Sequence, residues 1–308
     1  MPQHHSTLSE LVQLVSARRA PLSVAKAFEL LSPLSIGLRQ KIPVLLNGAR
    51  LFRIRKMVAK PLFTAMVGAP PVEVVPVGRL NDHRQSVLYL ADSPDTAFAE
   101  ARALAGQYCL SEWRVEWPRV ALANGGLDST ILGEHFPNDL DSPIAIQAGT
   151  EDHDVLALFT SIFTLSVGDD TDLYRWSIAC GMSNGFAHRC ERNGSEVVAG
   201  NTKLTGRFPF SGIAYRSTRK DRTAINYAFN DLGQTYLSLN HLQWVERHTD
   251  GSFSSIDIAN SWGESGKISW EGRPAQYQLQ SGQAAKVVKA DKDTWTYENL
   301  DGSIPIFI

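Results

Sequence analysis

Residues 86–100 read Ser-Val-Leu-Tyr-Leu-Ala-Asp-Ser-Pro-Asp-Thr-Ala-Phe-Ala-Glu and predict a strand that is followed directly by a capped helix. Its apolar first part, 86–91, predicts a largely buried strand. Asp92-Ser93-Pro94-Asp95 then predicts the start of a helix, because a capping side chain is followed by proline in the first turn and by an acid near the positive end of the helix dipole. We expect this helix to run to about Ala105 and to end at Gly106.

The segments on either side change from helical, through mixed, to β-rich along the chain. Apolar residues at helical spacing predict helices over 8–18, 21–31, 155–167 and 171–181, the last preceded by possible capping aspartates at 169, 170 and 172. Strand patterns fall at 51–55, 210–217, 267–270 and 285–289, and β structure dominates from about Leu237. Turn signals fall at 124–126, 136–139, Asp250-Gly251 and Asp301-Gly302, the last two typical of hairpins.

Composition excludes several classes of protein. The chain has 308 residues, of which 43% are hydrophobic and 20% charged, so we expect a packed core. A net charge of −2 argues against general nucleic-acid binding, which normally leaves a basic excess. No apolar run reaches the roughly 18 residues of a membrane helix, and no signal peptide is visible at the N-terminus. These features predict a cytoplasmic protein that does not bind membranes.

The cysteines predict neither a disulfide framework nor a metal site. The chain has 3 of them, Cys109, Cys180 and Cys190. Such a sparse, odd set favours buried or inert thiols in a reducing compartment. His188 lies close to Cys190, but two candidate ligands do not make a zinc site. We therefore expect no metal.

Three short stretches carry a resemblance to a known family. The first is Leu51-Phe52-Arg53-Ile54, and the second joins Gly78-Arg79-Leu80-Asn81 to the strand and helix of 87–100. The third is Gly212-Ile213-Ala214-Tyr215-Arg216-Ser217. In this order they resemble the RES domain. Its pattern has a strand-borne Arg, a Gly-Arg turn before a Leu-Tyr-x-Ala strand, a Ser-Pro-x-x-Ala-x-x-Glu helix, and a late Gly-Ile-x-Tyr-x-Ser strand.

The resemblance implies an α+β fold with a split, mixed β-sheet similar to that of ADP-ribosyltransferases, which holds NAD in a cleft. It places an NAD-binding catalytic domain at 46–236, between an N-terminal helical cap at 1–45 and a β-rich C-terminal extension at 237–308. Known members include toxins of bacterial toxin–antitoxin pairs that deplete NAD, in some cases by phosphorolysis. NAD is thus the expected substrate, inorganic phosphate a possible second substrate, and an antitoxin or immunity protein an expected partner.

The chemistry of NAD cleavage explains the residue types. Nicotinamide departs from a cationic pyridinium, so no general acid is needed. The transition state instead needs a carboxylate beside the positive charge that develops on the ribose. The resemblance gives this role to Glu100. It gives the diphosphate, or an incoming phosphate, to Arg53 and Arg79, because a guanidinium fork matches phosphate oxygens two at a time.

The same pattern adds Ser217 to the catalytic set, where it could hold a ribose hydroxyl or a phosphate. We do not interpret Ser217 as a nucleophile, because no His–acid pair accompanies it. The remaining residues that the pattern assigns to NAD binding are Tyr89, Asn81 and Tyr215.

Each of these residues also has a purely structural interpretation. Glu100 could lie on a solvated helix face, and Arg53 or Arg79 could be an ordinary surface charge. Tyr89 could be a core residue with a satisfied hydroxyl, and Ser217 could close a turn. The other cationic residues near Ser217 could form a solvated loop or contact a phosphate or an acidic inhibitor; they are Arg216, Arg219, Lys220 and Arg222.

Two positions depart from the family pattern. Leu80 stands where an aromatic residue is usual, and Asp82-His83-Arg84-Gln85 takes the place of a glycine. These departures leave open the shape of one pocket wall and the choice of acceptor.

We therefore expect an enzyme that breaks the nicotinamide–ribose bond of NAD, either with water, as an NAD glycohydrolase, or with phosphate, as an NAD phosphorylase. Depletion of NAD by such an enzyme is toxic. The alternatives are an ADP-ribosyltransferase that modifies a protein, and a non-catalytic module that binds NAD, ADP-ribose or a partner. The segments outside 46–236 could cover the cleft in cis.

Overall fold

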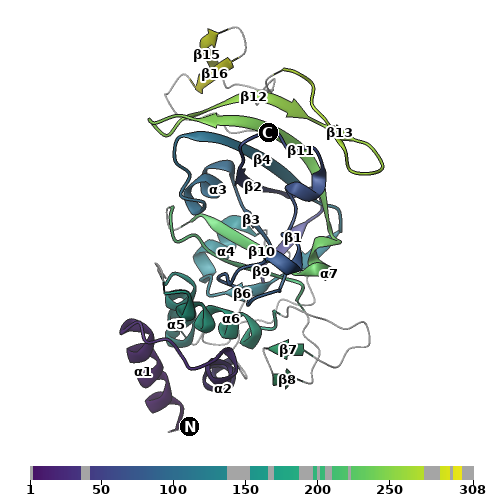
Figure 1. Ribbon diagram of the computed structural model, residues 1–308. Helices are drawn as coiled ribbons and strands as arrows, with labels where there is room; N and C mark the ends of the chain where they lie inside the picture. Colours follow the sequence, from purple (N-terminus) through teal and green to yellow (C-terminus); the bar gives the residue numbers. More distant parts are fainter. Residues whose placement is uncertain are drawn as a thin grey trace. The chain divides into compact units, whose positions relative to one another are not determined.

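The chain is an α+β protein that divides into two compact units (Figure 1). The computed structural model describes residues 3–35, 42–136, 153–165, 170–186, 197–199, 202–204, 210–220, 223–273, 285–291 and 294–299. Unit 1 comprises 1–49, 69–92 and 115–237, and unit 2 comprises 50–68, 93–114 and 238–308. The chain therefore passes from one unit to the other several times, including at 49/50 and 237/238. The domain bounds 1–45, 46–236 and 237–308 stay predictions.

A mixed β-sheet forms the centre of unit 1. Its strands are hydrogen-bonded in the order β3 (Leu88–Ala91), β10 (Ile225–Phe229), β9 (Gly212–Arg216) and β6 (Ala123–Gly125). β10 runs antiparallel to both of its neighbours, whereas β6 runs parallel to β9. The predicted α+β class with a mixed sheet is confirmed, and so are the strands predicted within 86–91 and 210–217.

The loop predicted over Asn124-Gly125-Gly126 was wrong in part, because β6 extends to Gly125. A Cβ at Gly125 would stand 2.6 Å from the Cβ of Tyr215, so this glycine permits a close approach of two strands. Gly126 does make a turn, with a φ of 85°. The two glycines predicted a loop, but only Gly126 lies in a turn.

Helices cover one side of unit 1. The predicted helices are confirmed as α1 (Gln3–Ser16), α2 (Val24–Ser35), α5 (His153–Phe163) and α6 (Tyr174–Ser183). α5 packs against β6 and β9, while α1 packs on α5 and α2 on α6 (Figure 1). Leu31, Phe159 and Trp176 are at most 1% exposed in this core, and burial of each such side chain contributes about 1.5–3 kcal/mol. The N-terminal helices therefore share the core of unit 1.

Smaller elements complete unit 1. Two short antiparallel pairs are β1 (Val44–Leu46) with β5 (Arg119–Ala121) and β7 (Val197–Ala199) with β8 (Thr202–Leu204). The short helical segments are η2 (Val72–Val74), α4 (Ser129–His135), η3 (Thr171–Leu173) and α7 (Asp231–Gln234). Asp170 caps η3 by accepting from the amide of Asp172, as predicted, whereas Asp169 lies outside the described residues.

Unit 2 is a β-sheet with one short helix. The strands are hydrogen-bonded in the order β15 (Ala285–Asp291), β16 (Thr294–Asn299), β12 (Phe253–Ala259), β11 (Leu237–Arg247), β4 (Gly106–Val115) and β2 (Arg50–Lys56). Two short strands, β13 (Ser261–Trp262) and β14 (Ile268–Ser269), form a separate hairpin, and η1 (Thr64–Met66) follows β2. The strand at 51–55 and the β-rich C-terminal region are confirmed.

The helix of unit 2 starts as predicted but ends earlier. α3 spans Pro94–Glu100, and the Oγ of Ser93 caps it by accepting from the amide of Thr96 at 3.2 Å. It ends in a Schellman arrangement: the amide of Ala103 donates to the carbonyl of Phe98 at 3.1 Å, and residue 102 has a left-handed φ of 47°. The prediction of Ala105 as the helix end was wrong, because this cap ends the helix without a glycine.

The turn predicted at Asp250-Gly251 is confirmed, and so is the burial of two of the cysteines. Asp250-Gly251 joins β11 to β12, with Gly251 at a φ of 88°. Cys109 and Cys180 are buried and not in a disulfide. Burial raises the pKa of the Cys109 thiol to about 12, and it also raises the pKa of Cys180 well above its usual value. Residues 137–139 of another predicted turn, Asp301-Gly302, His188 and Cys190 lie outside the described residues.

No helix among the described residues is long and apolar enough to cross a membrane. Within the same part of the chain, no group of three or more His, Cys, Asp or Glu side chains is placed to hold a metal ion.

Candidate functional site

The turn Gly78–Asn81 in unit 1 is a tight, internally bonded clip. The amide of Gly78 donates to the carbonyl of Asn81 at 2.9 Å, and the Asn81 Nδ2 donates to the carbonyl of Pro76 at 2.7 Å. Asn81 is 2% exposed, so these bonds satisfy a buried amide. A Cβ at Gly78 would fall on the Oδ1 of Asn81 and 3.2 Å from the Tyr89 hydroxyl, so only glycine fits there. We call residues 78–81 the clip.

Tyr89 on β3 locks the clip from the side. Its hydroxyl accepts from the amide of Leu80 at 2.9 Å and donates to the Oδ1 of Asn81 at 2.8 Å. A phenol that uses both its donor and an acceptor position in this way holds the turn in one conformation. The structural interpretation of Tyr89 is thus realised, and Asn81 acts with it. Both residues hold the backbone of Arg79, which lies in the middle of the clip.

Arg79 is anchored to the end of α5. Its Nη1 donates to the carbonyls of Phe163 and, at 3.3 Å, Leu165, and its guanidinium lies 5.8 Å from the ring centroid of Tyr174. A cation at a helix C-terminus interacts favourably with the helix dipole. Among the described residues, Arg79 donates from Nη1 alone, so the N–H groups of Nε and Nη2 can serve a bound anion.

The backbone of Arg79 is held from another side. Ser177 on α6 donates its hydroxyl to the Arg79 carbonyl at 2.5 Å. Leu80, which replaces the aromatic residue of the family pattern, is fully buried, and its Cδ2 would stand 2.9 Å from a Cβ at Gly181. The Leu80 side chain therefore packs directly against Gly181 of α6, where a larger residue than glycine would leave it too little room.

The segment 82–85, which departs from the family pattern, contains a left-handed residue. Arg84 adopts a left-handed φ of 60°, which glycine adopts without strain. The turn is supported by Gln85, whose Oε1 accepts from the amide of Asp82 at 2.7 Å, and by the Asp82 carboxylate, which accepts from the amide of His83. Residues 82–85 thus form a turn next to the clip, with Arg84 in a conformation that glycine adopts most easily.

Tyr215 is a core residue that contacts the same helix end as Arg79. It is 4% exposed, and its ring stacks on Phe163 with centroids 5.7 Å apart. Phe163 therefore brings together Arg79, through its carbonyl, and Tyr215, through its ring. This burial makes ring stacking on a ligand by Tyr215 incompatible with the packing observed.

Ser217, at the end of β9, closes a turn. Its Oγ accepts from the amides of Arg219 and Lys220 at 3.2 and 3.1 Å, and its own amide donates to the carbonyl of Ala224. The residue is 7% exposed. An oxygen that already accepts two amide bonds is a poor nucleophile, in agreement with the sequence interpretation.

The cationic residues near Ser217 differ in their surroundings. Arg216 forms an ion pair with Asp128 at 3.5 Å, whereas Arg219 and Lys220 are exposed. Arg222 lies outside the described residues.

Arg53 on β2, in unit 2, is half-buried. Its Nη1 donates to the carbonyl of Gly68 at 2.9 Å, and its own carbonyl accepts from the Oγ of Ser111 at 3.2 Å. Arg55, two residues on and therefore on the same face of the strand, donates to the carbonyl of Met66 at 2.5 Å. Burial lowers the pKa of Arg55. Both guanidinium groups thus donate to main-chain carbonyls of the segment that follows β2.

Glu100 is the last residue of α3 and is half-buried. The helix predicted to run to about Ala105 would have placed Glu100 in its middle, which was wrong. A carboxylate at this end of a helix faces the negative pole of the dipole, which is unfavourable by about 0.3–1 kcal/mol. Proteins break such local rules mainly at functional sites. The position of Glu100 therefore favours a role other than helix stability.

The β2–β4 register shows which face each motif uses. Arg53 pairs with Ser111, so both side chains lie on one face of the sheet. α3 packs through Phe98, whose ring meets Tyr108 at 5.9 Å, and Tyr108 lies on the opposite face because it differs from Ser111 by an odd number of positions. Phe98 is also covered by Phe253 and Arg247.

Sequence reasoning missed the residues that hold the motif residues. Phe163, Tyr174 and Ser177 fix Arg79, and Gly68 receives Arg53. The Arg79–Phe163 contact joins residues 84 positions apart, and no local pattern carries such information. The only available signal was the pair of helices predicted at 155–167 and 171–181.

Comparison with known proteins adds little to this description. No known protein family and no curated protein matches the chain. Among solved structures, the crystal structure of the M. tuberculosis MbcT–MbcA toxin–antitoxin complex is similar over 73% of this chain and 94% of that chain, with 11% identity and a TM-score of 0.35. A TM-score of this size does not establish a shared fold, so the functional argument rests on the chain's own residues.

Proposed function

We propose that the protein cleaves the nicotinamide–ribose bond of NAD, as the RES-domain resemblance implies. The observation that carries the proposal is Glu100, a carboxylate kept at the unfavourable end of a helix that a Schellman cap ends directly after it. A carboxylate held on a rigid element can stabilise the positive charge that develops on the ribose as nicotinamide leaves with the bonding electron pair.

Two arginines support the proposal. Arg79 is fixed by the clip and by the end of α5, and Arg53 is fixed by the Gly68 carbonyl. An arginine whose orientation is set before binding loses less entropy when it binds a phosphate group. We assign Arg79 to the anionic part of NAD or to inorganic phosphate. For Arg53 the same role rests on the family resemblance, because its side chain lies on the face of the β2–β4 pair opposite to the one on which Phe98 of α3 packs. Ser217 is proposed to contact a hydroxyl or phosphate, and Tyr89 and Asn81 to act through the clip.

The fold proposal goes with the activity: the mixed sheet is proposed to be of the ADP-ribosyltransferase type. If free NAD is consumed in the cell, the protein is a toxin, and an antitoxin or immunity protein would be its partner. Expression should then arrest growth, and co-expression of the partner should relieve the arrest.

Product analysis of the purified full-length protein tests the proposal. NAD would be incubated with the protein, with and without inorganic phosphate, and nicotinamide, ADP-ribose and ADP-ribose 1-phosphate quantified by liquid chromatography and mass spectrometry. Free ADP-ribose identifies a glycohydrolase, and a phosphate-dependent 1-phosphate identifies a phosphorylase. Transfer of label from NAD to a protein would instead identify an ADP-ribosyltransferase. Absence of nicotinamide under all conditions would leave a non-catalytic binding module.

A further inference from the structure

The segment 57–68 links the C-terminal part of unit 2 to Arg53. We infer that residues 253–273, which comprise β12 to β14, are a positioning element for Arg53: they fix 57–68 in place, and the Gly68 carbonyl in turn orients the guanidinium. The functional side of this inference rests on the proposed NAD cleavage. It gives a role to the C-terminal β region, which the family pattern does not explain.

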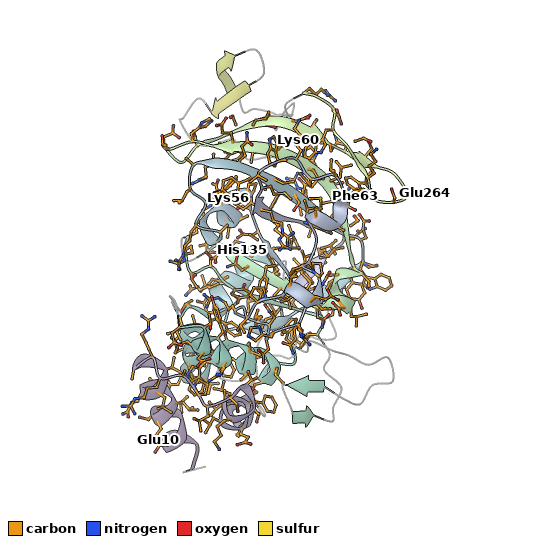
Figure 2. The ribbon with its side chains drawn as sticks, in the orientation of Figure 1. Glu10, Lys56, Lys60, Phe63, His135 and Glu264 are labelled. Atoms are coloured by element: carbon orange, nitrogen blue, oxygen red, sulfur yellow. The ribbon has the colours of Figure 1, made fainter. Side chains whose placement is uncertain are left out.

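The strongest link is an ion pair between Lys60 and Asp257. The Lys60 Nζ contacts the Asp257 Oδ2, while the Oδ1 accepts from the amides of Ile258 and Arg273 at 2.8 and 3.0 Å. The Asp257 side chain is 2% exposed and that of Lys60 is 38% exposed. A buried carboxylate requires such partners, because an unpaired charge in the interior is strongly unfavourable. The ion pair therefore fixes the Lys60 side chain against Asp257 of β12 (Figure 2).

The position of Asp257 is unusual within the sheet. The β11–β12 register shifts between Trp244 and Val245, so that Trp244 pairs with Asp257 and Val245 with Ser255. Such a bulge re-aims a side chain and recurs near functional sites. Here it places a carboxylate in the middle of a strand where it meets a lysine from a distant segment.

Backbone bonds attach the rest of the segment to the β13–β14 hairpin. The amide of Thr64 donates to the carbonyl of Gly266 at 2.9 Å, and the amide of Ile268 donates to the carbonyl of Leu62 at 2.8 Å. Phe63, labelled in Figure 2, forms a bridge with Lys267. Residues 62–64 thus behave as an additional strand on the hairpin.

Trp270 joins the ion pair to the backbone attachment. Its Nε1 donates to the carbonyl of Pro61 at 3.0 Å, and its ring centroid lies 5.5 Å from the Lys60 Nζ. A cation over an indole ring is attracted by the ring quadrupole. One side chain therefore supports two neighbouring residues of the segment.

The far end of the segment carries the contacts to the arginines. Val67 is 1% exposed and packs in an apolar cluster with Cys109, Trp244 and Ile268. The neighbouring carbonyls of Met66 and Gly68 accept from Arg55 and Arg53. Because Val67 is buried between these two carbonyls, a shift of the segment would move both acceptors and with them the direction of each guanidinium.

The test compares lysine substitutions in the full chain. Lys60→Met removes the charge but keeps an unbranched side chain for packing on Trp270, and Lys56→Met is the matched control, because Lys56 is exposed at the end of β2 (Figure 2). Lys60→Arg restores the charge. Trp270→Phe is a milder second variant that keeps an aromatic ring and removes the Pro61 bond. Amide hydrogen exchange at Thr64 and Ile268, and KM and kcat for NAD, would be measured for each.

We expect Lys60→Met to speed exchange at both amides and to raise KM about tenfold with kcat within about twofold, because a misdirected guanidinium weakens binding. Lys60→Arg should restore both values, Trp270→Phe should show a smaller effect, and Lys56→Met should match the wild type. A loss of kcat at constant KM would indicate a smaller folded fraction and would overturn positioning, as would unchanged exchange. If the wild type releases no nicotinamide, the proposed function fails, while the exchange result still decides whether 253–273 fixes the segment.

Discussion

The clip in unit 1 and the 57–68 segment in unit 2 each help to orient an arginine, but different kinds of contact hold them in place. Each directs an arginine of the family motif with main-chain carbonyls: those of Phe163 and Leu165 hold Arg79, and that of Gly68 holds Arg53. The clip itself is local, because Tyr89 reaches back only 8 residues to Asn81. The segment depends on partners as far as 209 residues away, such as the Trp270–Pro61 bond.

This difference explains why the sequence indicates part of the support of Arg79 but none of the support of Arg53. Gly78, Asn81 and Tyr89 belong to one motif, so the motif contains Arg79 and the groups that hold the backbone of its turn, while the carbonyls that anchor its guanidinium lie outside the motif. The motif around Arg53 contains the arginine alone. Its support comes from a region that no motif covers, so the role of the C-terminal strands had to come from the structure.

The largest expected effect comes from breaking the clip with Tyr89→Phe. The change leaves the Leu80 amide and the Asn81 Oδ1 without their partner, and each unsatisfied buried group costs about 1–3 kcal/mol. We expect about 3 kcal/mol less free energy of unfolding in urea. Tyr236→Phe, on a half-exposed ring, should stay within about 0.5 kcal/mol of the wild type. Equal small losses in both variants would mean that the hydroxyl does not hold the clip.

Gly78→Ala should have the next largest effect. The added Cβ would collide with Asn81 Oδ1, and overpacking of this kind costs about 1–3 kcal/mol. Gly133→Ala is the control: it lies in α4 with open space around it, so it should stabilise by about 0.5–1 kcal/mol. Thermal unfolding would show opposite signs for the two variants. A shift in the same direction would contradict the close contact at Gly78.

The apolar packing against segment 57–68 predicts that the stability of the protein depends on pH. Cys109 lies in the apolar cluster beneath 57–68, and burial raises its pKa to about 12 in the folded state, from a usual value of 9.0. Between these values the unfolded chain binds fewer protons, so stability is intact below about pH 9 and is lost as the pH rises toward 12, by up to about 1.4 kcal/mol per pH unit. Urea unfolding of Cys109→Ala between pH 8 and 11 should show a slope smaller by about one proton. An unchanged slope would place the ionisation elsewhere.

The smallest expected effects concern two strained turns, one in each unit. Arg84 and Arg102 have left-handed φ values of 60° and 47°. Replacement by glycine relieves about 1–2 kcal/mol of strain but adds about 0.5–1 kcal/mol of chain entropy to the unfolded state. We expect Arg84→Gly and Arg102→Gly each to stabilise by about 0.5 kcal/mol in differential scanning calorimetry. A clear loss of stability would show that the arginine side chain itself is needed.

Particular elements show how far the sequence could be taken. The helices at 8–18, 21–31, 155–167 and 171–181 and the capped start of α3 follow from periodicity and capping, which are local properties. β4 was missed, because its residues 106–115 lack strict alternation and are buried through 108–112. The end of α3 was wrong because an arginine, not a glycine, takes the left-handed position. The site residues were proposed from a motif, but the contacts that anchor the Arg79 guanidinium join residues 84 and 86 positions apart and follow only from the fold.

The central claim concerns the carboxylate at the end of α3, and Glu100→Gln tests it most directly. Removal of a group that stabilises the transition state should lower kcat for nicotinamide release about 10²–10³-fold. Gln has nearly the same shape as Glu, so the variant should stay folded, which thermal unfolding would show. The control Glu134→Gln, on exposed α4, should keep full activity. A folded Glu100→Gln protein that releases nicotinamide at the wild-type rate would contradict the account.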